Sequence, residues 1–564
     1  MGCPEVVAPS ILPLLRSINM RIPRFLPVAV LAIVLSAIAG GVFGSRALAR
    51  QDEVGQQYRV FTSAIDAIEK EYLDDVPSDR LIYSAIDGML HTLDPHSSFF
   101  DPKSYAQMRE RQEGRYYGLG ITIQAIDGDI TVMSIFEGSP AYKKGLRRGD
   151  ILAKVGDLDM KGWTTDQAVK KLKGPKGTLV NVSIKRRGYD GLINMDVVRD
   201  EVNITTVQAA FMIDKETGYV KLDQFTETSD RELGDSLQKL TANGMKRLVF
   251  DLRENPGGAL DQAIRIANRF LPRGDLIVYT HGRVQNANQK YVATESSDYT
   301  HLPVVTLVNR NSASASEIVS GALQDHDRAL IVGETTFGKA LVQSVYPISE
   351  QAGVAVTTGR YYTPSGRLIQ RPWDGTFDEY LTYTLRDQTS AERQHKASDL
   401  KLTDAGRKVY SGGGIEPDKF VVGAGMEGFN PTRFGRLLFA RQEFANFADQ
   451  FRAEGDTRFS DANKNKKSIS RGFVVDDKML ADFKSTLATR KVKIDEESFA
   501  KDDTFIRAMI HFEIDRTLFN MEEARRNLIA KDPQAQFALA QFPEAEHLMD
   551  LSATKSTRSA RGGQ

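Results

Sequence analysis

Apolar strand-like runs alternate with helical runs along the middle of the chain, from about Leu192 to Gly425. RLVFDL and PVVTLVN are apolar enough for buried strands, and each precedes a stretch with apolar residues at helical spacing. Strands that alternate with helices in this way predict an α/β layer built around a sheet. A polar segment with turn-rich ends, 372–411, interrupts the pattern, and we interpret it as an insertion.

The two flanks of this region have a different pattern. Residues 50–112 carry apolar residues at helical spacing, and so do long charged stretches within 426–564, so we expect a helical segment before the α/β core and a helical region after it. The final stretch, SATKSTRSARGGQ, is polar and is expected to be disordered. A chain of 564 residues is too long for a single core of usual size, and several domains are expected.

An apolar run without charges, 25–45, lies near the N-terminus and is long enough to cross a bilayer as a helix. Arg16, Arg21 and Arg24 precede it, and the positive-inside tendency places residues 1–24 in the cytoplasm. We therefore expect 25–49 to be a signal peptide or a membrane anchor, two alternatives that stay open. The rest of the chain is then extracytoplasmic, which in a bacterium means the periplasm.

Charge and cysteine content exclude several classes of function. Lys plus Arg and Asp plus Glu both number 74, so no excess charge favours nucleic acid. Cys3 is the only cysteine, which excludes an intrachain disulfide and a thiolate zinc cluster. The loop LDPHSSFFDPKSY does not match a metal-ligand spacing, and its Asp-Pro pairs are turn signals. We interpret it as a structural loop, although the loop and the residues just before it offer four residues of types that bind metals: His91, Asp94, His96 and Asp101.

Residues 113–190 consist of short β runs separated by glycines. ITIQAI and ITVMSI flank a DGD turn and predict a hairpin, and TTDQAVKKL begins with a threonine cap and continues as a helix. The order of glycine loop, hairpin, GSPA…GLRRGDIL, strand, helix and strand resembles a PDZ domain. The resemblance implies that the strand from Ile121 takes up a peptide by β-augmentation. It also implies that main-chain amides hold the peptide's terminal carboxylate, at Tyr117, Gly118, Leu119 and Gly120. A small β domain with an empty groove is the alternative.

The stretch VNRNSASASEIVSGALQD, 308–325, allows two interpretations. SASE fits a capping box, with Ser314 as the N-cap and Glu317 reaching back to it, and this predicts the start of a helix. A serine in that position also lies beside unpaired amides and the positive end of the helix dipole, which suit an oxyanion. The two roles are compatible, so Ser314 is a candidate nucleophile.

A base for Ser314 is not expected in the same helix. His326 would lie about 18 Å along the helix and Asp325 about 16 Å, too far for a Ser–His–Asp triad. Lys339 follows the glycine-marked loop of GETTFGKALVQS and shares one strand face with Gln343. An inward-facing lysine needs a role or a partner, and Ser–Lys pairs are a known arrangement of hydroxyl and base.

Together these motifs resemble the carboxyl-terminal processing peptidases, also called tail-specific proteases. The likeness is carried by NRNSASASEIVSGALQDHDRALIVGETTFGKALVQS, with DLRENPGGAL before it and TTGRYYTPSGRLIQ and GGGIEPD after it, over about 58–422. It implies a serine endopeptidase core over 191–425 with an inserted PDZ-like domain. It further implies Ser314 as nucleophile, Lys339 as general base and Gln343 as the residue that orients the lysine. The implied oxyanion hole consists of amides of Ala315 and of Gly257 or Gly258.

The resemblance also implies protein substrates bound by their C-termini, and no metal, nucleotide or prosthetic group. Asp325 has an assigned role in some members, but its distance from Ser314 makes it structural here. Ala340 departs from the family pattern, because relatives often carry a second glycine there, and this puts the loop's backbone angles and the turnover rate in doubt. That departure is the only support for the alternative function, a catalytically silent PDZ adaptor. A homo-oligomer is compatible with the sequence.

Overall fold

The protein is described by a computed structural model that covers residues 36, 54–186, 188–373, 380, 382, 395–423, 428–454 and 469–561. It divides into two compact units, Met1–Met89 and Leu90–Gln564. In the first unit a helix covers 54–71, and helix α2 (Ser78–His91) begins. The apolar run 25–45 lies outside the described residues, apart from Ser36. Within the described part of the chain, no helix is both long and apolar enough to cross a membrane.

The second unit starts with two short elements, strand β1 (Ser98–Phe100) and helix α3 (Pro102–Glu113). Asp101 caps α3, because its carboxylate accepts from the Ser104 amide at 2.7 Å, and Pro102 occupies the first helical position, where its missing N–H is not needed. Asp101 is therefore engaged in a helix cap. Within the described residues no group of His, Cys, Asp and Glu is arranged to hold a metal ion.

A β domain follows, in which one sheet has the strand order β3-β4-β5-β7-β8, with β6 beside β5. The hairpin of β3 and β4 turns at Asp127 and Gly128, whose φ angles of 52° and 78° suit the two-residue turn that matches strand twist. The first and last strands of the segment, β2 and β9, pair with each other. The elements are β2 (Arg115–Gly118), β3 (Ile121–Ile126), β4 (Asp129–Ile135), α4 (Pro140–Lys143), β5 (Ile151–Val155), β6 (Leu158–Asp159), α5 (Thr165–Leu172), β7 (Leu179–Lys185), β8 (Ile193–Val198) and β9 (Asp200–Asn203).

The boundary expected at residue 190 cuts this sheet, and the structure corrects it. Strand β8 pairs with β7 from Ile193 to Val198, so the β domain continues beyond residue 190. The sequence analysis places INMDVV in the α/β core, because the alternation of strands and helices is expected from about Leu192 onward. Its pairing partner, strand β7, lies earlier in the chain.

The core is a six-stranded sheet of order β10-β11-β12-β15-β16-β21, antiparallel between β10 and β11 and parallel elsewhere. Its central strands are buried on both faces, as expected of a covered parallel sheet. The elements are β10 (Val207–Met212), β11 (Thr217–Leu222), α6 (Ser229–Ala242), β12 (Arg247–Asp251), α7 (Leu260–Asn268), β15 (Val304–Val308), α8 (Ala315–Asp325), β16 (Leu330–Gly333) and β21 (Lys419–Phe420).

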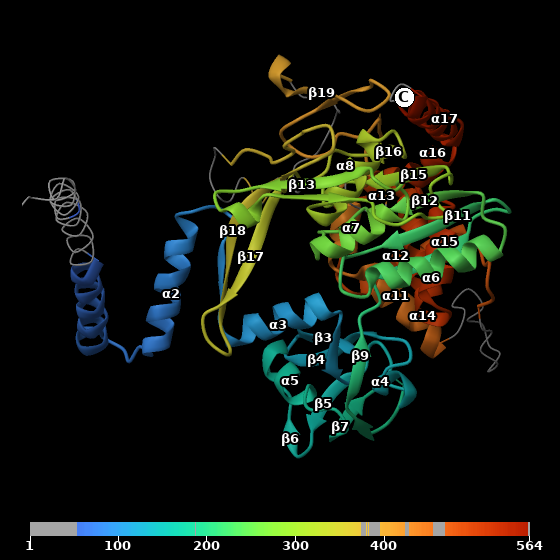
Figure 1. Ribbon diagram of the computed structural model, residues 1–564. Helices are drawn as coiled ribbons and strands as arrows, with labels where there is room; N and C mark the ends of the chain where they lie inside the picture. Colours follow the sequence, from blue (N-terminus) through green and yellow to red (C-terminus); the bar gives the residue numbers. More distant parts are fainter. Residues whose placement is uncertain are drawn as a thin grey trace, which may run out of the picture. The chain divides into compact units, whose positions relative to one another are not determined.

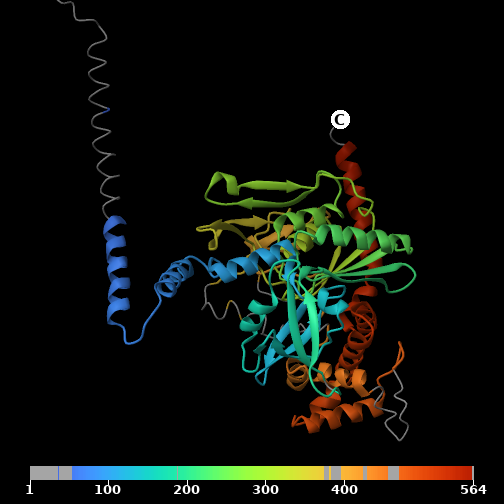
Figure 2. The same cartoon turned by 90° about the horizontal axis from the view of Figure 1, so that it is seen from below.

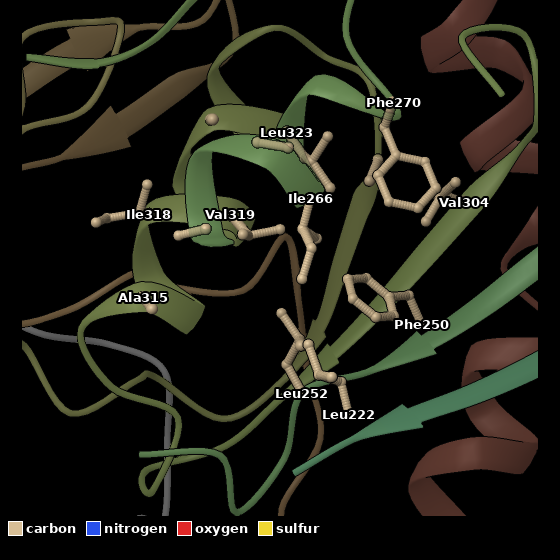
Figure 3. Close-up of a cluster of buried hydrophobic side chains, with 14 of the residues drawn as sticks. Leu222, Phe250, Leu252, Ile266, Phe270, Val304, Ala315, Ile318, Val319 and Leu323 are labelled. Atoms are coloured by element: carbon tan, nitrogen blue, oxygen red, sulfur yellow. The ribbon is translucent and has the colours of Figure 1, made fainter. Parts of the chain in front are cut away.

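Helices cover both faces of this sheet. On one face α6, α7 and α8 pack against Phe250 and its neighbours, and Figure 3 shows Val319 and Leu323 of α8 among these side chains. On the other face α16 (Pro533–Leu539) and α17 (Phe542–Arg561) pack against Val249 and the side chains that alternate with the first set. In Figure 2 these C-terminal helices, in red, run beside the green strands. The α/β core predicted from the alternating pattern is confirmed.

A second sheet lies beside the core and has the order β1-β18-β13-β14, with β17 also paired to β18. The long β17–β18 hairpin is yellow in Figure 1. Within the insertion, the continuous described segment 395–411 contains a short antiparallel pair of strands. The elements are β13 (Leu276–His281), η1 (Gln285–Ala287), β14 (Gln289–Val292), β17 (Leu341–Pro347), β18 (Gly353–Tyr362), η3 (Ala397–Asp399), β19 (Leu400–Leu402) and β20 (Lys408–Tyr410).

The described C-terminal region is helical, as predicted, and has a core of its own that is rich in phenylalanine. Its remaining helices are α10 (Arg433–Ala440), α11 (Glu443–Glu454), α12 (Asp477–Thr489), α13 (Glu496–Lys501), α14 (Asp503–Leu518) and α15 (Met521–Ile529). The expectation of a disordered tail from 552 is corrected, because α17 continues to Arg561. That stretch is polar, but no glycine or proline interrupts it before residue 562.

Candidate active site

Ser314 lies at the turn between strand β15 and helix α8. Its backbone angles, φ 53° and ψ −111°, are rare for a residue with a side chain, and such a conformation costs on the order of 1–3 kcal/mol. An ordinary N-cap has extended angles and bonds the helix through its hydroxyl, whereas the Ser314 hydroxyl makes no capping bond. The amide of Glu317 donates to the Ser314 main-chain oxygen at 2.9 Å. The Ser314 hydroxyl is thus left without a role in capping the helix.

The two neighbouring serines are engaged in the scaffold. The Ser312 hydroxyl donates to the Leu252 carbonyl at 2.8 Å, and the Ser316 hydroxyl donates to the Asn255 carbonyl at 3.0 Å. Both side chains are fully buried, while Ser314 is partly exposed. Of the three serines, Ser314 therefore has the hydroxyl that a substrate can reach.

Glu317 binds the segments of Ser314 and Lys339 together. Its Oε2 accepts from the Ser314 amide at 2.8 Å and from the Lys339 amide at 2.9 Å. Its Oε1 accepts from the Thr336 hydroxyl and the Gly338 amide, both at 2.6 Å. Burial raises the pKa of Glu317 to about 7, and the four hydrogen bonds act in the opposite direction. One of the two hydrogen bonds of the predicted capping box, from the Ser314 amide to the Glu317 carboxylate, is present. The same carboxylate also binds the loop 336–339.

Tyr361 makes a second link between the two segments. Its hydroxyl lies 3.1 Å from the Ser314 carbonyl oxygen and 2.6 Å from the Lys339 carbonyl oxygen. The side chain is almost fully buried. Together with Glu317 it fixes the spacing between the main chains of Ser314 and Lys339.

The Lys339 amine lies in a largely buried position just before strand β17. Burial lowers its pKa, and the negative charges of Glu317 and Asp94 work against this effect. Its Nζ donates to Gln343 Oε1 at 3.1 Å. The pair therefore meets as the strand alternation predicts. The extra residue in the β17–β18 pairing, Thr358, belongs to β18 and leaves the alternation of β17 intact.

Ala340 fits its position without backbone strain. The non-glycine residues with positive φ do not include it, and its amide donates to Gln370 Oε1 at 2.8 Å. Gly338, two residues earlier, does need to be glycine, because its φ is 86° and a Cβ would lie 2.9 Å from the Gly414 nitrogen. The departure from the family pattern at Ala340 therefore leaves the loop's backbone angles ordinary.

The turn at Gly257 and Gly258 packs directly against Ser314. A Cβ on Gly257 would lie 2.8 Å from the Ser314 Cβ, so only glycine fits there. The Gly257 amide is already engaged, since it donates to Asn255 Oδ1 at 2.9 Å. Within the described residues, the amides of Gly258 and Ala315 have no acceptor. These two amides are the ones left to bind an oxyanion.

His326 and Asp325 lie at the far end of α8 from Ser314, as the helix length predicts. His326 Nδ1 lies 2.7 Å from an Asp404 carboxylate oxygen, and Nε2 lies 2.7 Å from the Leu276 carbonyl oxygen. Asp325 accepts from the Ser365 amide and hydroxyl and forms a buried ion pair with Arg367. Both residues bind neighbouring segments to the end of the helix.

The loop interpreted as purely structural also reaches the site. The Gln343 Nε2 donates to the His96 main-chain carbonyl, while the His96 ring lies 2.8 Å from the Tyr380 hydroxyl. Burial lowers the pKa of His96 to about 4, and the positive charge of Lys339 adds to the effect. Sequence reasoning missed this contact because the bond is made by a main-chain atom, for which the residue type carries no signal.

A groove of about 360 Å³ lies between β3 and α5, at the free edge of the β-domain sheet. Three of the five residues predicted to bind a peptide line it: Leu119, Gly120 and Ile121. Gly120 must be glycine, since its φ is 78° and a Cβ would lie 2.2 Å from the Ser139 Cβ. Tyr117 and Gly118 belong instead to strand β2, outside the groove lining.

Three charged residues that line the groove were not foreseen from the sequence: Glu110, Arg111 and Lys173. The Lys173 amine pairs with the Glu110 carboxylate of α3. It also lies 4.7 Å from the centre of the Tyr116 ring, which lines the groove. The Lys173–Glu110 ion pair therefore lies at the end of the groove nearest the glycine loop, where Gly118 packs against the Lys173 side chain.

Three segments of the chain match known protein families. Residues 216–376 match peptidase family S41, residues 107–185 match the PDZ domain, and residues 44–104 match the N-terminal domain of the activating protease CtpB. The carboxy-terminal-processing protease of Bartonella bacilliformis is 35% identical over 380 residues, which cover 67% of this chain and 85% of that protein.

A second relative and one solved structure are also similar to this chain. The carboxy-terminal processing protease CtpA of Bacillus subtilis is 31% identical over 355 residues, or 62% of this chain and 75% of that protein. The structure of the photosystem II D1 C-terminal processing protease is 31% identical, with a TM-score of 0.32, and covers 55% of this chain and 89% of that chain.

Proposed function

Since the chain belongs to the carboxy-terminal processing protease family, we propose that it cleaves protein substrates with Ser314 as nucleophile and Lys339 as general base. Family membership makes the protein a serine protease with a PDZ domain. One observation carries the assignment of residues. Ser314 is the accessible serine of the three, and its amide shares an acceptor atom with the amide of Lys339.

The reaction begins with proton transfer from the Ser314 hydroxyl to a neutral Lys339 amine. The lowered pKa of Lys339 supports this role, because only the unprotonated amine accepts a proton. The Ser314 oxygen forms a bond to the scissile carbonyl carbon, and the carbonyl oxygen becomes an oxyanion. The free amides of Gly258 and Ala315 are positioned to donate to it.

The tetrahedral intermediate then collapses to an acyl-enzyme. The C–N bond breaks, and the leaving amine takes the proton held by Lys339. In the second half, Lys339 accepts a proton from water as that water attacks the ester, and the proton passes to the Ser314 oxygen as the acid product leaves. Gln343 accepts a hydrogen bond from the amine and orients its lone pair toward Ser314.

Substrates enter by their C-terminal tails, which we place in the groove of the β domain. Strand β3 has a free edge that can pair with an extended peptide, and the glycine loop precedes it. The Lys173 amine at this end of the groove can donate to a terminal carboxylate if it exchanges its present partner, Glu110, for the peptide.

The catalytic region acts outside the cytoplasm in this proposal. Its support is the uncharged run 25–45 with three arginines before it. A reporter enzyme that works only in the cytoplasm, fused after residue 561, is expected to be inactive. An active fusion would contradict the placement.

The central test compares wild-type protein with Ser314→Ala on a mixture of extracytoplasmic proteins, with products identified by mass spectrometry. We expect new C-termini with wild type only, unaffected by metal chelators. Equal cleavage by the variant would refute the nucleophile. Lys339→Ala and Lys339→Arg are both expected to be inactive, because a guanidinium stays protonated.

A further inference from the structure

We infer that the loop Asp94–Ser97 is a positioning element of the catalytic site, and that it acts by holding the His96 carbonyl against the side-chain amide of Gln343. The inference rests on the proposed function, in which Gln343 orients Lys339. It assigns a role to a loop that its sequence marks only as a turn.

The contact decides which way the Gln343 amide points. A main-chain carbonyl can only accept a hydrogen bond, so the Gln343 group that faces His96 must be its NH₂. The oxygen of the same amide is then turned toward the Lys339 amine, at 3.1 Å. Without the His96 carbonyl nothing in this pair prevents the reverse orientation, in which the Gln343 NH₂ group would donate to the neutral amine and occupy the lone pair that must accept the Ser314 proton.

Asp94 sets the shape of the loop. Its Oδ1 accepts from the amides of His96 and Ser97 at 2.8 Å each, and its Oδ2 accepts from the Ser97 hydroxyl at 2.8 Å. The pKa of Asp94 is lowered, because these hydrogen bonds outweigh the burial that acts to raise it. An ionised Asp94 thus holds the peptide unit between His96 and Ser97 by its N–H group, which belongs to Ser97, and the carbonyl group of this peptide unit, which belongs to His96, faces Gln343.

Ser97 fastens the loop to the strand that pairs with Gln343. Its buried hydroxyl accepts from the Thr357 amide at 3.2 Å, and Thr357 is the cross-strand partner of Gln343 in the β17–β18 hairpin. The His96 carbonyl and the Gln343 carboxamide are therefore held in place by the same pair of strands, β17 and β18. Their relative position does not depend on a flexible connection.

A chain of hydrogen bonds also connects the loop to the segment that carries Lys339. The His96 ring meets the Tyr380 hydroxyl, which accepts from Gln370 Nε2 at 3.0 Å. Gln370 in turn accepts from the amide of Ala340, the residue after Lys339. The loop is thus held from both segments that it positions.

The experiment is a double-mutant cycle, measured as kcat and KM on a quenched fluorescent peptide with a free apolar C-terminus. We expect Gln343→Ala to lower kcat on the order of tenfold to a hundredfold, since misplaced catalytic groups lose this much. Asp94→Ala should lower kcat by a similar factor and leave KM within about twofold. In the Gln343→Ala background, Asp94→Ala should lower kcat no further, because its effect passes through Gln343.

Two further variants separate positioning from general stability. Asp94→Asn keeps an oxygen that can accept from both amides, so it should restore most of the kcat lost in Asp94→Ala. Asp101→Ala is the matched control. It removes a similar side-chain bond to a main-chain amide a few residues away, where it caps α3 without contact to Gln343. Thermal melting should fall comparably in both alanine variants, while kcat falls only at Asp94.

The inference is wrong if Asp94→Ala leaves kcat intact, changes KM alone, or lowers kcat equally with and without Gln343. It is also wrong if Asp101→Ala lowers kcat as much as Asp94→Ala. The proposed function fails in a different way. A Gln343→Ala variant with wild-type kcat would remove the orienting role of Gln343, and a wild-type protein that leaves the peptide uncut would remove the activity.

Discussion

The main-chain amides of Ser314 and Lys339 donate to one and the same oxygen atom, Oε2 of Glu317, at 2.8 and 2.9 Å. The two residues are 25 positions apart in the sequence and belong to different loops. A shared acceptor sets the distance between their main chains more tightly than two separate contacts would. The buried carboxylate therefore couples the geometry of the proposed nucleophile to that of its base.

Glu317→Gln should lower kcat on the order of a hundredfold, because the NH₂ group of glutamine must face at least one of the four donors. An unmatched donor pair should also reduce the free energy of unfolding by about 1–3 kcal/mol. Peptide turnover and denaturant unfolding measure the two effects. The control is Glu443→Gln, which changes another buried carboxylate that pairs with Arg490 in the helical region. Normal turnover by Glu317→Gln would contradict the coupling.

Ser314→Gly should be more stable than Ser314→Ala by about 1 kcal/mol. Both variants lose the hydroxyl, but φ 53° with ψ −111° strains alanine and suits glycine. A capping serine would also rank glycine above alanine, but it would leave Ser314→Gly a few tenths of a kcal/mol less stable than wild type, whereas relief of strain should make this variant at least as stable as wild type. Denaturant unfolding of wild type and the two inactive variants decides the question. Equal stabilities would show that the turn relaxes without strain.

The activity should rise with pH as Lys339 loses its proton, with a midpoint below 10.5, the pKa of an unperturbed lysine. The stability should follow with a defined sign. The unfolded chain keeps the lysine proton up to about 10.5, while the folded protein releases it earlier, so this residue makes stability rise with pH between the two values. Lys339→Met should lack both trends. A pH profile of kcat/KM that stays flat in wild type would argue against Lys339 as the base.

His326→Ala should keep most of the activity and lose stability of about 1–3 kcal/mol at low pH. The pKa of His326 is raised, because its hydrogen bonds to Asp404 and Leu276 outweigh the burial that acts to lower it. Its contribution is therefore complete below pH 6.5 and is lost as the pH rises through the raised value. The exposed His301, changed to alanine, serves as the control. A His326→Ala protein that is folded but inactive would point to a histidine base.

Peptides with a free, apolar C-terminus should bind the β domain more tightly than the same peptides as amides. The expected difference is on the order of 1.5–3 kcal/mol, the contribution of hydrogen bonds to a charged group. Isothermal titration with the Ser314→Ala protein measures it without cleavage. Lys173→Met should reduce the preference, since the Lys173 charge stands at this end of the groove. Equal affinities for acid and amide would leave the terminal carboxylate without a role in recognition.

Much of the architecture could be predicted, because the strand and helix patterns are local. The alternation over the core, the DGD hairpin and the start of α8 at Ser314 all follow from residues close together in sequence. The predicted end of the β domain was misplaced, because strand β8 pairs with β7, which lies earlier in the chain. The tail after residue 552 was misjudged, because polar residues without glycine or proline continue a helix as readily as they leave one.

The site could be predicted only where a motif carries it. Ser314 and Lys339 stand in recognisable motifs, and strand alternation places Gln343 beside the lysine. The second function of Glu317 was hidden, because its capping role explained its position fully. The His96 contribution was invisible for a different reason, since a main-chain carbonyl is present at every residue and only the fold selects one.

The contact between His96 and Gln343 joins residues 247 positions apart, on either side of the inserted β domain. A chain emerging from the ribosome therefore makes the His96 loop first, then the inserted β domain, and only then the segments that carry Ser314, Lys339 and Gln343. Until the two flanks of the inserted domain have closed on each other, the lysine lacks its oriented partner. If this partner matters as proposed, a chain that is still being synthesised has no competent active site.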